Sequence, residues 1–78
     1  MKSVMIKLAT IEDIRKFVGM LAKYNVDLDL KSGRYTVDAR SIMGVLLFDW
    51  LQPVEFIIHS DDDSVVSAVL ADVKAWTV

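Results

Sequence analysis

The 78-residue chain has no cysteine, no strong excess of one charge and no long uncharged apolar run. Without cysteine it forms neither disulfides nor thiolate metal sites, which favours an intracellular location. Its formal net charge of −2 gives no electrostatic footprint for nucleic acid or anionic membranes. No apolar run approaches the roughly 20 residues that span a bilayer, and the start, MKSVMIKLATIED, is a poor signal peptide. We therefore expect a cytoplasmic protein that binds neither nucleic acid nor membrane.

Apolar side chains are abundant instead and make up 54% of the residues. A chain of this size forms one domain, residues 1–78, near the lower limit for a self-sufficient hydrophobic core. Much of the surface of so small a domain cannot be hidden, so part of the apolar surface is expected to stay exposed. Such exposure indicates a protein partner or self-association.

Two hydrophobic periods along the chain predict an α+β fold. Segments in which every second residue is apolar, the pattern of half-buried strands, are 3–8, 26–31, 34–39 and 53–60. Helices are predicted at 11–24, 41–48 and 62–76. The first and the last each carry an apolar stripe able to cover the sheet: Ile11, Ile14, Phe17, Val18 and Leu21 in the first, and Val66, Val69, Leu70 and Val73 in the last. Ser32-Gly33 marks a tight hairpin turn between the second and third strands. The order β-α-β-β-α-β-α, with one apolar face on each strand, predicts an open-faced β-sandwich: a four-stranded antiparallel sheet covered on one face by helices.

The segment ARSIMGVLLFDW, residues 39–50, is unusually apolar for a short helix. Ser41 occupies the position of its N-cap, a role worth ~1 kcal/mol. Val45 and Phe48 are the better core candidates. Because the two longer helices already suffice to cover the sheet, this helix is free to lie at the edge. Its apolar excess then points outward in part.

The pentapeptide SIMGV, placed after the hairpin and before PVEFIIHS, resembles HPr, the histidine-containing phosphocarrier family of the bacterial sugar phosphotransferase system. The similarity covers most of the chain and implies the fold described above. It also implies that Ser41 is a regulatory phosphorylation site. The apolar residues after it are implied to form a docking surface for protein partners, here Ile42, Met43 and Leu46.

The other HPr motif, a phosphoryl-carrying histidine in a Gly-containing loop followed by Arg and Pro, is absent. At the family's spacing from Ser41, the phosphoacceptor falls at Thr10, the arginine at Glu12 and the proline at Asp13. Carboxylates in the first turn of a helix stabilise that helix but repel an incoming phosphoryl group. The resemblance and the physics therefore both predict that phosphocarrier chemistry is lost.

Each candidate residue also has a plainer structural explanation. Ser41 is explained equally well as a simple helix cap, and Thr10 with Asp13 as a capping box at the start of the first long helix. The implied docking residues Ile42, Met43 and Leu46 could instead belong to the core. Trp50 either extends the docking surface or folds back as a lid. The lone His59 is predicted to be solvated on the outer face of the sheet. No metal site is expected, because the DDDS run lacks the alternating ligands and glycine of a calcium loop.

The sequence thus predicts an HPr-like protein that is not an enzyme and needs no cofactor. It would act as a protein-binding or regulatory module through Ser41 and the apolar 42–50 segment. One alternative is a phosphocarrier with an atypical acceptor. The other is a structural oligomer unit that associates through the strand at 34–38 or through the apolar helix.

Overall fold

A computed structural model of the chain describes residues 1–48, 50 and 52–78. The elements follow in the predicted order, with bounds that differ from the expected ones by a few residues. They are β1 (Lys2–Ile6), α1 (Ile11–Leu21), β2 (Asp27–Ser32), β3 (Tyr35–Asp38), α2 (Ile42–Leu46), β4 (Val54–His59), α3 (Asp63–Asp72) and a final 3₁₀ turn, η1 (Lys74–Trp76). Within the described residues, no helix is both long and apolar enough to cross a membrane.

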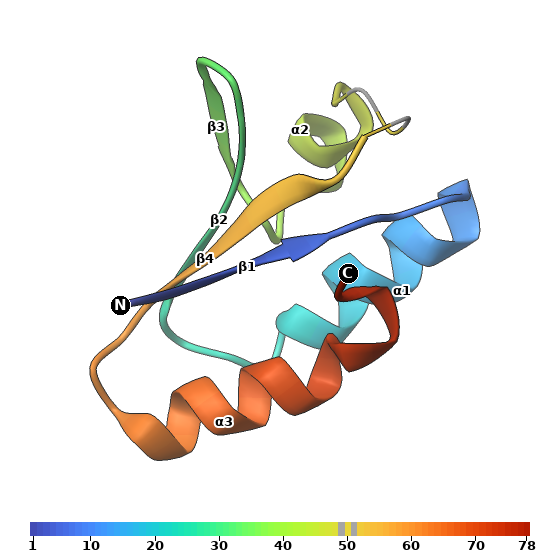
Figure 1. Cartoon of the computed structure of the whole chain (residues 1–78). Coiled ribbons are helices and arrows are strands. Elements are labelled where there is room, and N and C mark those ends of the chain that lie inside the picture. The colour runs from blue at the N-terminus through green and yellow to red at the C-terminus, as the bar shows by residue number, and fades with distance from the viewer. Residues whose placement is uncertain (49, 51) are drawn as a thin grey trace.

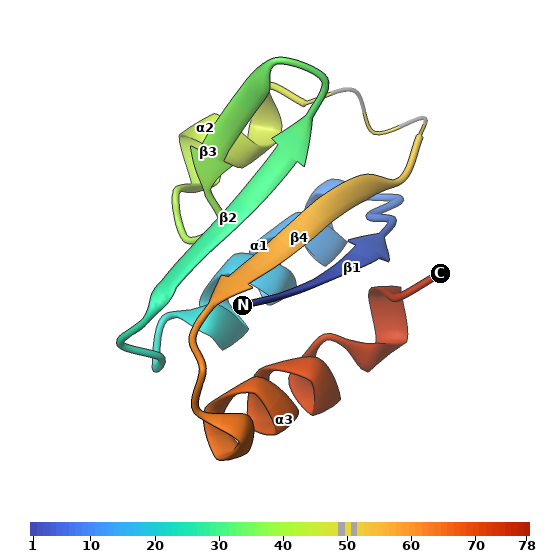
Figure 2. The same ribbon diagram turned by 60° about the vertical axis from the view of Figure 1, so that its left-hand side comes forward.

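The four strands form one antiparallel sheet in the order β1-β4-β2-β3. Helices α1 and α3 lie on one face of this sheet, while α2 lies beside β3, away from α3 (Figures 1 and 2). The predicted open-faced α+β architecture is therefore confirmed.

The core lies between the inner face of the sheet and the helices, and the alternation of the strands determines which residues enter it. Every second residue of β2 and β4 is buried, which is the period that a one-sided sheet requires. The buried apolar residues are Ile6, Leu8, Ile14, Phe17, Leu21, Leu28, Leu30, Ala39, Val45, Phe48, Val54, Phe56, Ile58, Val69 and Val73. The two helical stripes predicted from the sequence thus meet the sheet, apart from Ile11, which is exposed.

A polar cluster ties the end of α1 to α3 and explains why α1 ends at Leu21 instead of residue 24. The Tyr24 hydroxyl donates a hydrogen bond to the Asp72 carboxylate, and the Lys23 ammonium lies 3.0 Å from the same group. The Arg40 guanidinium donates to the carbonyl oxygen of Tyr24 at 2.7 Å. Burial and the bond to Asp72 raise the pKa of Tyr24 to about 12. The hydrogen bonds from Tyr24 and Lys23 lower the pKa of Asp72 below its ordinary value.

The two edges of the sheet differ. The C-terminal residues pair with the end of the outer edge of β1: Lys7 N–H donates to the Trp76 carbonyl at 2.8 Å, and Val78 N–H donates to the Met5 carbonyl at 3.0 Å. An isolated bridge joins Ile6 and Thr77 between these two bonds. The other edge, β3, pairs only with β2 among the described strands.

Candidate functional site

Helix α2 begins where the sequence predicts, at Ser41. The Ser41 hydroxyl accepts a hydrogen bond from Gly44 N–H at 3.3 Å, and its carbonyl accepts one from Val45 N–H at 2.9 Å. Gly44 lets the helix approach β3 closely, because a Cβ built on it would lie only 3.2 Å from the Cβ of Val37. The cap and the glycine together fix this short helix over the edge of the sheet.

Four apolar side chains of this helix and its C-cap point away from the core. Ile42 is 38% exposed, Met43 71%, Leu46 39% and Leu47 83%. Residues spaced by three and four positions share one face of a helix, so these four side chains form a continuous surface. Val45 and Phe48 point the opposite way and are buried, as predicted. We call the four residues the α2 face.

A hollow of about 310 Å³ lies between this helix and the start of α1. We call it the α1–α2 hollow, and its lining residues are Ala9, Thr10, Ile11, Ile14, Leu46 and Trp50. Ile11 is 62% exposed beside it. The sequence stripe placed Ile11 in the core; this is wrong, because the first turn of α1 borders the hollow instead of the sheet. The apolar surface of α2 therefore continues onto α1.

Trp50 folds back toward the core and is not fully solvated. Its ring centre lies 6.0 Å from that of Phe48, with the two planes inclined by 40°. The indole N–H is buried and has no hydrogen-bond acceptor among the described residues. Trp50 thus forms one wall of the α1–α2 hollow. Asp49, inside the predicted contact segment 42–50, lies outside the described residues.

The three positions at which the resemblance places the phosphocarrier motif are all engaged at the start of α1. Thr10 is the N-cap, and its hydroxyl accepts from Asp13 N–H at 3.0 Å. The Asp13 carboxylate accepts in return from Ala9 N–H at 3.2 Å, one residue earlier than in a standard capping box. Glu12 forms an exposed ion pair with Lys16 at 3.5 Å. The positive end of α1 is therefore already matched by the chain's own carboxylates.

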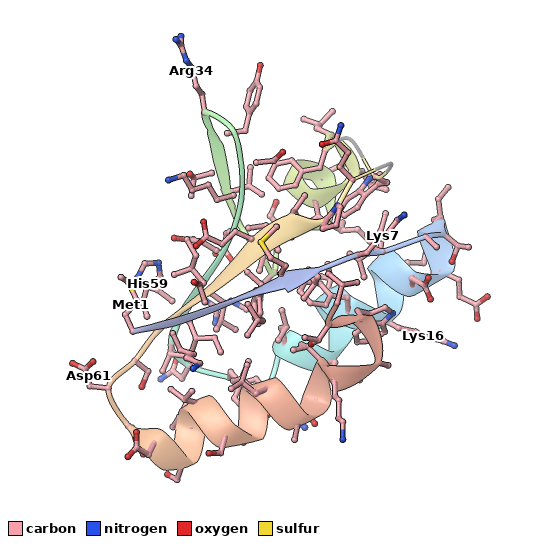
Figure 3. All side chains as sticks on the ribbon, viewed as in Figure 1. Met1, Lys7, Lys16, Arg34, His59 and Asp61 are labelled. Atoms are coloured by element: carbon pink, nitrogen blue, oxygen red, sulfur yellow. The ribbon has the colours of Figure 1, made fainter. Side chains whose placement is uncertain are left out.

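His59 is exposed, as predicted, and also contacts a carboxylate. Its Nε2 lies 2.8 Å from the Asp29 carboxylate on the neighbouring strand. Figure 3 shows His59 close to Met1 and Asp61, at the end of the molecule away from α2. In the part of the chain that the structure describes, no three His, Asp or Glu side chains gather closely enough to hold a metal ion.

Sequence reasoning missed two members of the exposed surface. Leu47 is not among the predicted patch residues, although it lies four positions after Met43 and one turn along the same helical face. The alternation of the 34–39 segment places Tyr35 on the same face as Val37, yet Tyr35 is 75% exposed. It lies at the tip of the β2–β3 hairpin, where it borders a second hollow of about 320 Å³ lined by Tyr35, Val37, Gly44, Leu47 and Phe48. We call this second cavity the β3–α2 hollow.

Comparison with known proteins identifies the architecture. No family model matches the chain, and no curated protein is significantly similar to it in sequence. Among solved structures, the chain resembles HPr-C-His from Thermoanaerobacter tengcongensis with a TM-score of 0.74. The match covers 96% of this chain and 93% of that chain, at 22% sequence identity. The chain therefore has the HPr-like fold.

Proposed function

We propose that the chain is a non-catalytic protein-binding module of HPr-like fold, and that a protein partner docks on the α2 face. The observation that carries the proposal is the outward alignment of Ile42, Met43, Leu46 and Leu47 on a helix that is capped and held in place. Exposed apolar surface of this kind is characteristic of interaction sites. The partner presents an apolar side chain to the α1–α2 hollow, where Ile11 and Trp50 meet it.

In this proposal the start of α1 does not carry a phosphoryl group. The Thr10 hydroxyl accepts the hydrogen bond that caps the helix. Glu12 and Asp13 stand in the same turn, and their charges oppose the approach of a phosphoryl donor. The carboxylates that stabilise α1 thereby argue against the atypical-acceptor alternative.

Ser41 regulates the docking surface in the same proposal. Its side chain is exposed and precedes Ile42 and Met43 directly. A phosphate there would add about two negative charges next to the apolar contact. A partner with an apolar surface would then have to strip water from an unpaired charge, which costs several kcal/mol in a buried interface. Phosphorylation is therefore expected to release such a partner.

The docking proposal is tested with matched baits. Met43→Glu introduces one charge into the α2 face, and Met5→Glu introduces the same charge on the outer face of the sheet, where Met5 is also exposed. Wild-type protein, Met43→Glu and Met5→Glu are each immobilised and exposed to a lysate of the source organism. A protein recovered by wild type and Met5→Glu is then purified and titrated against all three by calorimetry.

We expect Met43→Glu to weaken that purified complex at least about a hundredfold, the effect of burying an unpaired charge, and Met5→Glu to leave it unchanged. If every complex formed by the wild type tolerates Met43→Glu, the α2 face is not the docking surface. A separate assay incubates the chain with radiolabelled phosphoenolpyruvate and the general phosphotransferase enzyme. Acid-labile label on the chain would refute the non-catalytic part of the proposal.

A further inference from the structure

The open edge of β3 offers unpaired backbone groups to another strand. Ala39 N–H donates to the Leu28 carbonyl at 2.7 Å, so the N–H of Ala39 points toward β2. Directions alternate along a strand, and the groups of Tyr35 and Val37 therefore also point toward β2. The N–H and C=O groups of Thr36 and the N–H of Asp38 point outward, where no described strand meets them. The Asp38 carbonyl instead accepts a hydrogen bond from Ser41 N–H at 3.0 Å.

Proline, lysine and a bulge, three features that commonly protect such an edge, are absent from β3. Strand edges are commonly blunted by proline, lysine, a bulge or a covering segment. The sequence of β3 is YTVD, which contains neither proline nor lysine, and its register with β2 runs without interruption from Tyr35 to Asp38. At the opposite edge, residues 76–78 cover the end of β1, from Met5 to Ile6, and the residue after it, Lys7. The β1 edge is thus partly covered, whereas no described strand covers β3.

We infer that β3 pairs with β3 of a second copy of this chain, antiparallel about a twofold axis through Thr36. The two sheets would then form one continuous sheet of eight strands. In this register Thr36 faces Thr36, Tyr35 faces Val37, and Arg34 faces Asp38 of the second copy, with the last two pairs formed twice. Threonine pairs, aromatic and β-branched pairs and opposite charges are the cross-strand combinations that stabilise antiparallel sheets.

Charge selects this register over its neighbours. The Arg34 side chain projects from the hairpin tip, away from the rest of the molecule (Figure 3). Asp38 is 55% exposed, and only one of its carboxylate oxygens is hydrogen-bonded to described residues, to Arg40. Moving the twofold axis to Val37 would place Arg34 against Arg40, and moving it to Tyr35 would leave Asp38 without a partner. Shifting by a single residue would turn the wrong backbone groups toward each other.

The β3–α2 hollow fits the same arrangement. Val37 and Leu47 both line it, and most of its lining residues are apolar. Tyr35 of the second copy faces Val37 across the new strand pair, at the mouth of this hollow. By symmetry, the largely exposed Tyr35 of the first copy reaches the equivalent hollow of the second. The exposure of Tyr35 is thereby explained as contact surface.

The inference is tested on the purified chain, without any partner. Sedimentation velocity from micromolar to millimolar concentration should show reversible dimerisation of the wild type. Arg34→Glu and Asp38→Arg each replace two attractive pairs by two repulsive ones, so each should weaken the dimer about tenfold or more. A mixture of the two variants restores opposite charges at both ends and should form a heterodimer. Arg15→Glu, which makes the same charge change on the exposed face of α1, is the control.

Amide hydrogen exchange supplies a second measurement that does not depend on any variant. The outward-pointing Thr36 N–H should gain protection as the concentration rises, while an exposed amide outside the edge does not. Thr36→Pro removes this N–H without removing a bond to β2 and should abolish the dimer while circular dichroism stays unchanged. A chain that stays monomeric at millimolar concentration overturns the inference. So does a dimer that survives Arg34→Glu and Thr36→Pro but is lost in Met43→Glu.

Discussion

The division of α2 into an outward and an inward face makes a quantitative prediction about two neighbouring truncations. Val45 is fully buried, and Val45→Ala removes two methyl groups from the core. At ~0.8 kcal/mol for each buried carbon plus the cavity left behind, this costs about 2 kcal/mol. Met43 is 71% exposed, so Met43→Ala removes little buried area and costs about 0.5 kcal/mol. The two changes lie two residues apart in the same helix.

The cost of Val45→Ala is large relative to the total free energy of unfolding. A domain of this length is stable by roughly 4–12 kcal/mol, and small proteins lose about 1 kcal/mol per molar urea. We therefore expect the urea midpoint to fall by about 2 M for Val45→Ala and by about 0.5 M for Met43→Ala, each at an unchanged slope. Titration of the purified partner completes the comparison, because Met43→Ala should weaken binding although it barely changes stability.

The opposite order of midpoints would refute the assignment. If Met43→Ala lost as much stability as Val45→Ala, Met43 would be core and the α2 face would lose its centre. A change of slope would show instead that the unfolded or native ensemble had changed compactness, and the comparison would then be repeated with Leu47→Ala.

Three further predictions concern the supports of the site. Ser41→Ala should lower the free energy of unfolding by ~1 kcal/mol in urea titrations. Ser41→Asp should retain most of the cap's contribution to stability, since the carboxylate still accepts from Gly44 N–H. Gly44→Ala should be destabilising by about 1 kcal/mol in the same assay. The new Cβ would lie 3.2 Å from the Cβ of Val37, and the steric cost of this close contact outweighs the gain in helix propensity. The pKa of Tyr24 is about 12 in the folded state against 10.0 for the free side chain, so its contribution to stability is complete below pH 10 and is lost as the pH rises toward 12. Wild-type stability should therefore fall over that range relative to Tyr24→Phe, and the same variant should raise the pKa of Asp72 in an NMR titration.

The strands and caps were predictable because their causes are local. Alternation in β2 and β4 places their apolar residues on one face, and the register confirms it. Ser41 and Thr10 cap helices because their hydroxyls reach N–H groups three residues ahead. The separation of Val45 from Met43 follows from helical spacing once the helix is placed at the edge.

What could not be predicted depends on contacts between distant segments. His59 meets Asp29 only because β4 pairs with β2 in one register. The apolar stripe of α1 does not indicate that Ile11 borders a hollow instead of the core. The hollow exists only where α2 packs beside α1, and the stripe does not predict the position of α2. The periodicity of 11–24 continued to Tyr24, which instead leaves the helix to bond Asp72, 48 residues away. Periodicity identifies the face of each element but not the neighbour that the face will meet.

The two proposed contact surfaces adjoin at one residue, and this links them physically. Leu47 belongs to the α2 face and also lines the β3–α2 hollow that receives Tyr35 of a second copy. A partner that covers Leu47 therefore changes the hollow, and a dimer that fills the hollow changes the surface offered to the partner. Because the coupling between two binding events is reciprocal, each must alter the affinity of the other by the same factor. If both proposed contacts form, the chain would respond to its own concentration through the same side chain with which it contacts its partner.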